Sequence, residues 1–361
     1  MKKIRKLGKG AFANVFLVKL ENGTYAALKI PNNTLSKKKA MRYSNSEVAI
    51  LEHFKKSEYI VNLYSYEITD KTNAIIVELL GDELDTLFNH YKKLNQVIPM
   101  PIIKHLLIQI LRGLDELATA NIIHNDLKLS NILFTKPLPN IFKQSEEAYI
   151  NNTCLNIQLN PHIKTHIKKY INVLKELLLT FTKVKISDFG NAFSKQMTID
   201  NEKSFKNSRP TRHYISPERL IMAPYWVESD MWSFGCIVYE LLTNHILFFP
   251  FKDNTMGINS VHLALIVKIF GKFPQELLNQ GEKSNKYFIG GKHRYNYLIQ
   301  KTSLNTNSFG NDPLSYMLYC YGVPEYKIAT FVEFLMPIFQ LNPKKRISPY
   351  NCLESDFLTK Y

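Results

Sequence analysis

The sequence has few cysteines, no long apolar run and no apolar stretch at its start. Its four cysteines are scattered and form no CxxC pair: Cys154, Cys236, Cys320 and Cys352. We therefore expect free thiols in a reducing cytoplasm or nucleus rather than disulfides or a zinc site. No run of about 18 apolar residues is present, so a membrane span is not expected. The opening residues MKKIRKLGKG lack the apolar core of a secretory signal.

Acidic residues are scarce relative to basic ones, with 31 Asp and Glu against 46 Lys and Arg and a net charge of +15. This balance favours acidic partners such as nucleotides, phosphoproteins, nucleic acid or anionic membrane surfaces. The lysines are dispersed, however, and the densest cluster is Lys37, Lys38 and Lys39. A compositional habit therefore explains the charge equally well. No RNA-binding signature is present, and a requirement for nucleic acid is not expected.

The first 80 residues contain mainly strand-like segments. These segments are rich in β-branched and aromatic residues, are separated by turn signals such as Asn22-Gly23, and cover residues 4–20, 24–30 and 74–80. One helix is predicted over residues 44–54, because Val48, Leu51 and Phe54 recur at helical spacing. With 361 residues, the chain can form one large domain or two unequal lobes.

After Gly81 the pattern becomes helical. Helices are predicted over residues 101–117, 228–244, 262–271 and 327–340. The segment 228–244 is apolar nearly all round, so we expect it to be buried. Residues 135–182 begin with Pro- and Asn-rich sequence and end in the helix-like stretch THIKKYINVLKELLLTF. We interpret them as an insertion between two functional loops.

Two motifs near the start suggest phosphate binding. In GKGAFANV, Gly8 and Gly10 would let the backbone approach nucleotide phosphates, although Ala13 occupies a third glycine position. A plain hairpin turn is the alternative. In AALK, Lys29 ends an apolar strand and needs a partner if it is buried, and Glu47 on the following helix is the candidate. An exposed strand end is the alternative there.

The stretch HNDLKLSNILF has the spacing of a phosphoryl-transfer loop. Asp126 can accept the proton of an incoming hydroxyl, Lys128 can neutralise charge on the transferring group, and Asn131 can offer an amide oxygen to magnesium. A polar loop with a capping Asp is the alternative, but it does not explain the order and spacing. In KISDFG, Asp188 suits a divalent metal that bridges to phosphates.

Two further acidic residues complete the set of motifs. Glu218 in SPE requires a buried cation, for which Arg346 in NPKKRIS is the candidate, and Asp230 follows in SDMWSFG. Taken in order, these motifs resemble those of eukaryotic-type protein kinases, from Ile4 to about Leu358. The likeness is first to the SR protein kinases and second to the LAMMER (Clk-type) kinases. It rests on KVKISDFGNAF, SRPTRHYISPERL, SDMWSFGCI and HLALIVKIFGKFP.

This resemblance implies one protein kinase domain over residues 1–361 with an α+β, bilobal fold. Its small β-rich N-lobe with one helix would cover residues 1–80, and its mainly helical C-lobe residues 81–361. It also implies a non-specific serine/threonine protein kinase that uses ATP and Mg2+, is a monomer, and resides in the cytoplasm or nucleus. Its substrates would be Ser/Thr proteins, with Arg-Ser-rich splicing factors as the family default.

The residue roles carried over from the resemblance divide into three groups. The catalytic residues would be Asp126 and Lys128. The magnesium ligands would be Asn131 and Asp188. The ATP-binding residues would be Gly8, Lys9, Gly10, Ala11, Phe12, Ala13, Val15, Ala27, Lys29, Glu47, Glu78, Leu80 and Leu133. Val77 matches the gatekeeper position, and Glu78 to Leu80 would supply hinge backbone hydrogen bonds.

Three positions depart from the family pattern. Asn125 stands where most kinases have an Arg that binds a phosphorylated activation loop, and where SR and LAMMER kinases usually have Thr. Because Asn cannot neutralise a phosphate, the hypothesis is an enzyme that is active without loop phosphorylation. Ser130 replaces a carboxylate that often faces basic substrates, and Ile215 replaces an Arg common in SR-kinase substrate loops.

The substrate and the functional class keep open alternatives. Near the helix that would form the docking groove, the sequence has Asn259, Ser260, Val261 and Lys268 rather than acidic residues. With a net charge of +15, an Arg-Ser repeat is not an electrostatically natural partner, so acidic or unbiased Ser/Thr sites stay open. A LAMMER-like kinase, a pseudokinase scaffold and a nucleic-acid-binding role are the other hypotheses.

Overall fold

The structure is a computed structural model that describes residues 1–10, 13–32, 36–69, 73–138, 182–194, 210–251, 257–294 and 312–360. The chain divides into two compact units. The sheet unit consists of Met1–Gly113 and Leu129–Ala192, and the helical unit consists of Leu114–Lys128 and Phe193–Tyr361. The predicted lobe boundary at residue 80 stays a prediction.

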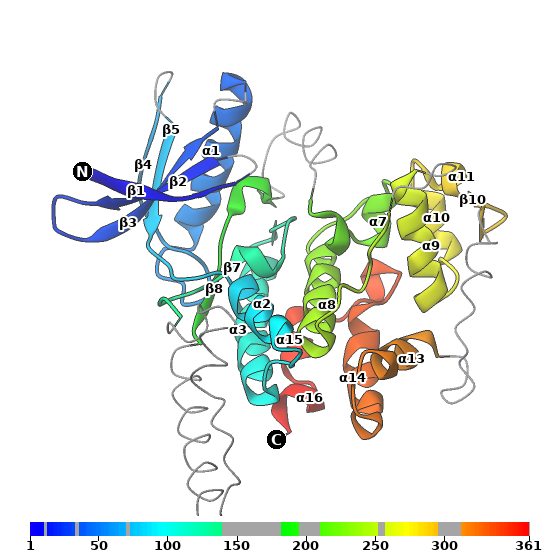
Figure 1. Cartoon of the computed structure of the whole chain (residues 1–361). Coiled ribbons are helices and arrows are strands. Elements are labelled where there is room, and N and C mark those ends of the chain that lie inside the picture. Colours follow the sequence, from blue (N-terminus) through cyan, green and yellow to red (C-terminus); the bar gives the residue numbers. More distant parts are fainter. Residues whose placement is uncertain are drawn as a thin grey trace, which may run out of the picture. The chain divides into compact units, whose positions relative to one another are not determined.

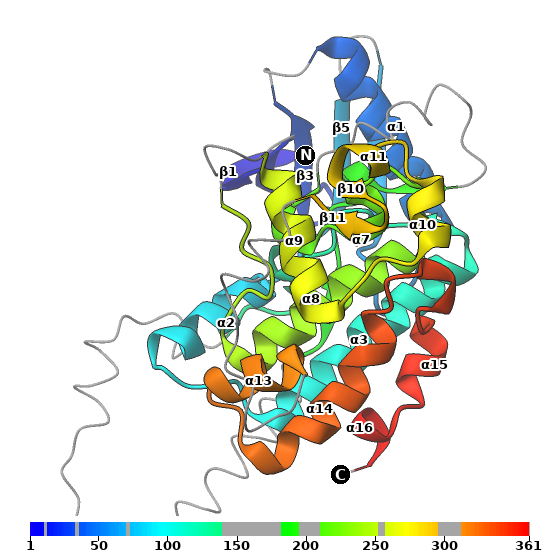
Figure 2. The ribbon, with the colours of Figure 1, turned by 90° about the vertical axis from the view of Figure 1, so that its right-hand side faces the viewer.

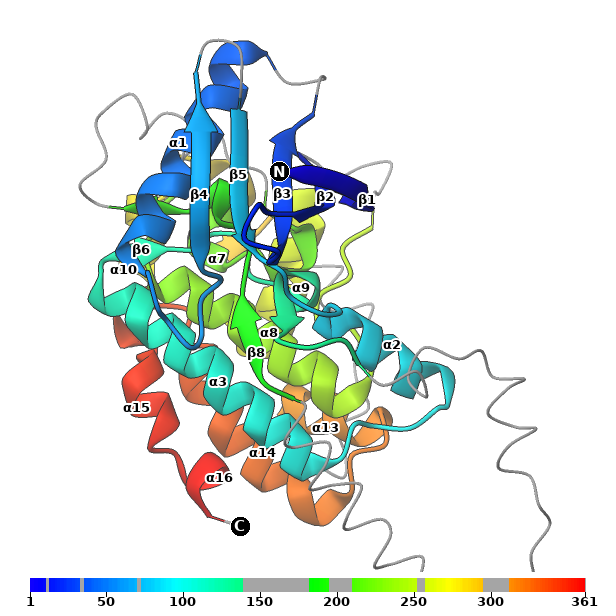
Figure 3. The same ribbon diagram turned by 90° about the vertical axis from the view of Figure 1, so that its left-hand side faces the viewer.

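The sheet unit is built on five antiparallel strands in the order β1-β2-β3-β5-β4. The strands are β1 (Lys2–Lys9), β2 (Ala13–Lys19), β3 (Tyr25–Pro31), β4 (Leu63–Ile68) and β5 (Asn73–Glu78). The predicted turn between β2 and β3 is confirmed, because Gly23 adopts a positive φ of 85° that favours glycine. Helix α1 (Lys37–His53) packs against β4 and β5, as Figure 3 shows.

The sheet unit also contains one further helix and the short elements that flank the predicted metal ligands Asn131 and Asp188. These are α2 (Leu84–Lys93), the short 3-10 helix η1 (Leu129–Asn131), β7 (Ile132–Phe134), β8 (Val184–Ile186) and the 3-10 helix η3 (Phe189–Asn191). Strand β7 pairs with β8, and α1 contacts η3. The long helix α3 (Met100–Thr119) belongs to the sheet unit up to Gly113 and to the helical unit beyond it.

The helical unit is organised around α8 (Glu228–Thr243), whose residues from Ser229 onward are all buried. Trp232 in the first half of this helix stacks on Phe248 at 5.7 Å and meets Phe339 edge-on at 5.0 Å. Helix α14 (Glu325–Ile338) contacts α8 and α13 (Pro313–Cys320), an arrangement visible in Figure 2. The sequence predicts a buried helix over residues 228–244 that is apolar nearly all round, and α8 confirms its burial.

The remaining elements complete the helical unit, and those from β9 onward are coloured from green to red in Figure 1. They are β6 (Ile122–Ile123), β9 (Phe193–Ser194), η4 (Arg212–Tyr214), α7 (Pro217–Leu220), α9 (Ile258–Phe270), α10 (Gln275–Gln280), α11 (Ser284–Tyr287), β10 (Phe288–Ile289), β11 (Lys292–His293), η5 (Pro343–Lys345), α15 (Pro349–Leu353) and α16 (Asp356–Thr359). Among the described residues, no helix is both long and apolar enough to cross a bilayer.

The predicted helices that lie in the described residues agree with the structure at their centres and differ at their ends, whereas the strand-like segment 4–20 divides into β1 and β2. Helix α1 begins at Lys37 rather than at residue 44, and α9 begins at Ile258 rather than at residue 262, so Asn259 and Val261 lie inside this helix. The predicted helix in the insertion lies outside the described residues, because residues 139–181 are not described. Cys236, Cys320 and Cys352 are free thiols, as predicted.

Candidate active site

Lys29 on β3 is the centre of an ion-pair network in the sheet unit. Its Nζ donates hydrogen bonds to both carboxylate oxygens of Glu47 on α1, at 2.7 and 2.8 Å, and to Oδ1 of Asp188 at 2.6 Å. Glu47 is only 4% exposed, so its charge needs this partner. The pairing of Lys29 with Glu47 that the sequence predicts is confirmed, and Asp188 joins the same cation.

The two carboxylates keep Lys29 charged. Burial by itself lowers the pKa of Lys29, but Asp188 and Glu47 outweigh that effect and the pKa lies above its ordinary value. Burial raises the pKa of Glu47, although Lys29 acts in the opposite direction. Lys29 is therefore an ammonium at neutral pH, and a fixed ammonium at the end of a strand can bind phosphate oxygens.

The register of the sheet places two predicted ATP-binding residues, Val15 and Ala27, and the gatekeeper position Val77 on the same face as Lys29. Val15 on β2 pairs with Lys29, and Ala27 pairs with Val77 on β5. Residues directly opposite in paired strands share a face, as do residues two apart along one strand. Val15, Ala27 and Val77 therefore lie on the face from which Lys29 reaches α1.

The glycine-rich turn connects β1 to β2. Gly8 pairs with Val15 and Lys9 pairs with Asn14, while Gly10 N–H donates to Ala13 O at 2.8 Å. Hairpin pairing of β1 with β2 is thus present up to Gly10 and again from Ala13, and the phosphate-binding role of this turn stays a prediction. The remaining two predicted residues of this loop, Ala11 and Phe12, lie outside the described residues.

A buried asparagine, which sequence reasoning missed, anchors this turn. Asn32 donates through Nδ2 to Gly10 O at 2.9 Å and accepts at Oδ1 from Asn14 Nδ2 at 2.8 Å. Asn32 is only 7% exposed. It follows the strand that carries Lys29 directly, and an Asn at such a strand end is the sequence signal that could have indicated a turn anchor.

The two predicted metal ligands are brought together by a short backbone link. Asn131 O accepts from the N–H of Ser187 at 2.9 Å and from its Oγ at 3.1 Å, and Asp188 is the next residue. Asp188 has a left-handed φ of 63°, a conformation that Asp tolerates better than most residues do. The link holds the chain segments of Asn131 and Asp188 next to each other.

The chemistry of this donor set fits Mg2+. One carboxylate and one amide oxygen are hard ligands, and Mg2+ in phosphoryl-transfer sites commonly takes its remaining ligands from phosphates and water. Within the described part of the chain, no group of three or more His, Cys, Asp and Glu side chains could hold a metal ion. The site therefore suits a metal that arrives with a nucleotide.

The predicted hinge carries an ion pair that the sequence did not reveal. Glu78 at the end of β5 accepts from Lys185 Nζ at 2.7 Å and from Asn62 N–H at 2.7 Å. Lys185 on β8 pairs with Leu133 on β7, which places Leu133 close to the ion pair between Lys185 and Glu78. A lysine inside the apolar run VKI was the available signal. The backbone hydrogen bonds predicted for Glu78 and Leu80 stay predictions.

In the helical unit, Asp126 and Lys128 converge on Thr211. Thr211 N–H donates to Asp126 Oδ1 at 2.8 Å, while Lys128 Nζ lies 3.4 Å from Asp126 Oδ2 and donates to Thr211 Oγ1 at 3.1 Å. A carboxylate with an ammonium at its side can take a proton from a hydroxyl while the ammonium neutralises phosphate charge. Thr211 lies in the segment SRPTRHYISPERL, and nothing in the sequence alone indicates its contact with Asp126 and Lys128.

The backbone before Asp126 is held by Asp230 at the start of α8. Asp230 accepts from His124 N–H at 2.7 Å and from Asn125 N–H at 2.9 Å. Burial raises the pKa of Asp230, while the two N–H groups and nearby cations oppose this rise. The departure at Asn125 has a local reason, since its φ of 70° is left-handed and Asn adopts that region at lower cost than most residues.

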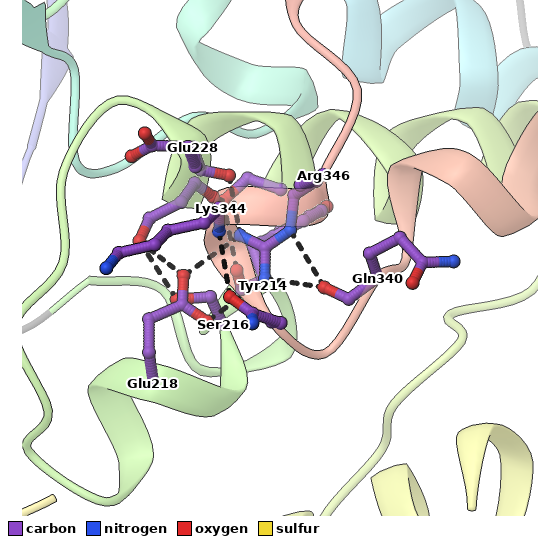
Figure 4. Close-up of polar contacts among 10 residues, drawn as sticks. Tyr214, Ser216, Glu218, Glu228, Gln340, Lys344 and Arg346 are labelled. Carbon is purple, nitrogen blue, oxygen red and sulfur yellow. Dashed lines mark hydrogen bonds and ion pairs between the residues drawn. The ribbon is translucent and has the colours of Figure 1, made fainter. Parts of the chain in front are cut away.

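The predicted ion pair between Glu218 and Arg346 is confirmed. Arg346 donates from Nη1 and Nη2 to the two carboxylate oxygens of Glu218, at 2.9 and 3.1 Å, and both side chains are fully buried. Figure 4 shows the guanidinium between Glu218 and Gln340, whose backbone carbonyl accepts two further hydrogen bonds. This pair fixes α7 to the segment after α14.

Several positions near the expected substrate site that depart from the family pattern are buried. Ile215 is 9% exposed, and Ser260 and Val261 on α9 are buried as well. Asn259 accepts from Arg212 Nη1 at 2.6 Å, which ties α9 to η4. Asn259 and its partner Arg212 therefore place polar groups next to the segment that follows Thr211.

Comparison with known proteins agrees with this geometry. The family model described as protein kinase domain matches residues 1–358. The serine/threonine-protein kinase SRPK of Physarum polycephalum is 30% identical over 98% of this chain and 85% of its own length. The dual specificity protein kinase lkh1 of Schizosaccharomyces pombe is 24% identical over 99% of this chain, which spans only 46% of that protein.

The likeness extends to a solved structure. The crystal structure of the PF14_0431 kinase domain superposes with a TM-score of 0.67 at 25% identity, covering 99% of this chain and 94% of that one. The expected α+β protein kinase fold, with a β-rich sheet in one part and helices in the other, is therefore confirmed. The chain belongs to the protein kinase family, among kinases of the serine/threonine type.

Proposed function

We propose that this chain transfers the γ-phosphate of ATP to Ser and Thr hydroxyls of protein substrates, and that it is active without phosphorylation of its activation loop. The observation that carries the proposal is the position of Lys29, whose Nζ lies within 2.8 Å of both Glu47 and Asp188. That arrangement presents a cation for phosphates beside a carboxylate for the metal, and ATP-dependent phosphoryl transfer requires both.

The chain's own residues divide the work of the reaction. Lys29 binds phosphate oxygens, and Asn131 and Asp188 hold Mg2+, which neutralises phosphate charge when bound. Asp126 accepts the proton of the attacking hydroxyl, whose oxygen forms the new bond to the γ-phosphorus as the bond to the ADP oxygen breaks. Lys128 offsets the negative charge of the transferring group.

The likeness to SR protein kinases supports Arg-Ser-rich proteins, including splicing factors, as substrates, whereas the net charge of +15 supports acidic sites. Independence from loop phosphorylation is supported by Asn125. Its side chain cannot neutralise a phosphate, and its backbone is held by contacts within the chain.

The test is phosphate transfer by purified protein with Mg-ATP and a mixture of Arg-Ser, acidic and proline-directed Ser/Thr peptides. We expect incorporation by the wild type and a loss of about 100-fold or more in Asp126→Asn, the scale found when a group central to transfer is removed. Equal incorporation by the two proteins, or none by either, would reject the enzyme and favour a scaffold that binds partners.

A further inference from the structure

Asn125, the residue just before Asp126, is held at both its N–H and its carbonyl within the helical unit. On one side, Asp230 accepts from Asn125 N–H at 2.9 Å and from His124 N–H at 2.7 Å. On the other side, the carbonyl of Asn125 accepts from Arg219 Nη1 at 3.1 Å. Together these contacts fix a residue whose φ is 70°, a region that non-glycine residues seldom occupy.

Arg219 is itself fixed by its surroundings. It belongs to α7 and directly follows Glu218, whose carboxylate is fully buried against Arg346. Its guanidinium carbon lies 4.7 Å from the ring centroid of Tyr225, within the range of a cation–π contact. The guanidinium therefore has little freedom to leave the Asn125 carbonyl.

The carbonyl of Asn125 is part of the same peptide plane as the N–H of Asp126. Turning that plane would reorient the backbone from which the Asp126 carboxylate projects. The N–H of Asp126 lies 3.3 Å from His124 Nδ1, so this plane is also held from the Asp126 side. A displacement of about 1 Å at a reacting group can cost about 100-fold in rate.

We propose that Arg219 is a positioning residue for Asp126. Acting through the Asn125 carbonyl, it orients the catalytic loop with a cation that the chain supplies from α7. The inference rests on the proposed kinase function and explains how the catalytic loop is held in place without phosphorylation. Asn125 has no guanidinium that could bind a phosphate on the activation loop. The catalytic loop is instead ordered by Arg219 and Asp230, and it needs no phosphate on the activation loop.

The test compares the wild type with Arg219→Met, Arg219→Lys and a matched control, all treated with phosphatase before assay. Arg294 provides the control, because it also donates to a backbone carbonyl of the helical unit, Asn285 O at 2.8 Å, but it is exposed. For each protein, kcat, KM for ATP, KM for a Ser peptide and the unfolding temperature are measured.

We expect Arg219→Met to lower kcat by roughly 10- to 100-fold with KM for ATP within about twofold of wild type. Arg219→Lys, which keeps one donor and the charge, should retain an intermediate kcat, and Arg294→Met should match the wild type. A purely structural role would instead lower the unfolding temperature and raise KM for ATP together with the loss of kcat.

A wild-type kcat in Arg219→Met overturns the inference, and so does a loss that Arg294→Met shares. If Arg219→Met fails to fold, Arg219→Lys decides. A kcat at least about threefold below wild type with unchanged KM for ATP supports the inference, and a wild-type kcat rejects it. Failure of the proposed function is distinct, because then the wild type itself transfers no phosphate, which overturns both.

Discussion

Glu218 and Arg346 illustrate, at the scale of single residues, how the helical unit bears a buried charge pair. Two charge-assisted hydrogen bonds join them, and Ser229 Oγ donates a further bond of 2.7 Å to Glu218. Both side chains are fully buried, so desolvation offsets much of their attraction. Removing one partner leaves the other charge buried without compensation, which is far more costly than losing an exposed pair.

Arg346→Met should therefore lower the free energy of unfolding by about 3–5 kcal/mol, measured by urea denaturation. Lys360→Met is the control, because the pair of Lys360 with Asp356 is exposed, at 63% and 76%, and its loss should change the free energy by less than about 0.5 kcal/mol. Equal effects of the two substitutions would contradict the assigned role of the buried pair.

The same pair makes the free energy of unfolding depend on pH, and the direction of this dependence follows from the pKa of Glu218. Burial raises the pKa of Glu218, but the charge and hydrogen bonds of Arg346 outweigh it, so the pKa lies below its ordinary value of 4.5. A depressed folded pKa stabilises the protein above the unfolded pKa and loses that contribution as pH falls through the folded value. The stability difference between wild type and Glu218→Gln should be constant above about pH 5 and shrink below pH 4.5. An unchanged difference at acid pH would contradict it.

Residue-level prediction worked where charge alone decides the partner. Glu47 and Arg346 were each predicted as partners because a buried Lys or Glu must be compensated. The contact of Arg219 was not predicted, because its acceptor is the backbone carbonyl of Asn125, 94 residues earlier in the chain. Every residue carries a carbonyl, so the sequence does not distinguish one acceptor from another, and only the tertiary fold selects it.

At the scale of elements, long periodic helices were predicted well and short or exposed elements were not. Helices α8 and α14 agree with prediction within two residues at each end. Strand β4 was missed although Tyr64, Tyr66 and Ile68 alternate with polar residues, because the segment is short and its alternating face is mostly exposed, with only Leu63 buried. Helix α2 was also missed, although Leu84, Leu87 and Phe88 recur at helical spacing over a short segment.

The link between β3 and α1 is the element-scale feature with the clearest functional consequence. Lys29→Met should lower kcat by about 100-fold or more, and Glu47→Gln should lower it less, because Lys29 keeps Asp188 as a partner. In a double-mutant cycle the two effects should couple by about 0.5–3 kcal/mol.

Lys55→Met serves as the control and should leave kcat unchanged. Lys55 follows the end of α1, and its substitution removes only an exposed ion pair with Glu52. Additive effects of Lys29→Met and Glu47→Gln, measured from kcat/KM, would mean that α1 is placed by packing alone.

At the scale of the whole molecule, a net charge of +15 sets the electrostatic field that a substrate meets. We expect acidic Ser/Thr peptides to have a lower KM than Arg-Ser repeats. That advantage should weaken between about 0.05 and 0.3 M salt, as the screening length falls to several ångströms. Steady-state kinetics on the two peptide classes measure it. A lower KM for Arg-Ser repeats at low salt would show that local contacts override the net charge.

The central claim is that the chain's own contacts order the catalytic loop, so that it transfers phosphate without a phosphate on its activation loop. The most direct measurement is the single-turnover transfer rate of protein made in bacteria, before and after complete phosphatase treatment, with intact mass used to verify that no phosphate remains. The account predicts the same rate within about twofold. Position 125 of the catalytic loop is Asn and not Arg, so the loop has no cation there that an activation-loop phosphate would bind. Loss of transfer on treatment, restored by rephosphorylation, would contradict it.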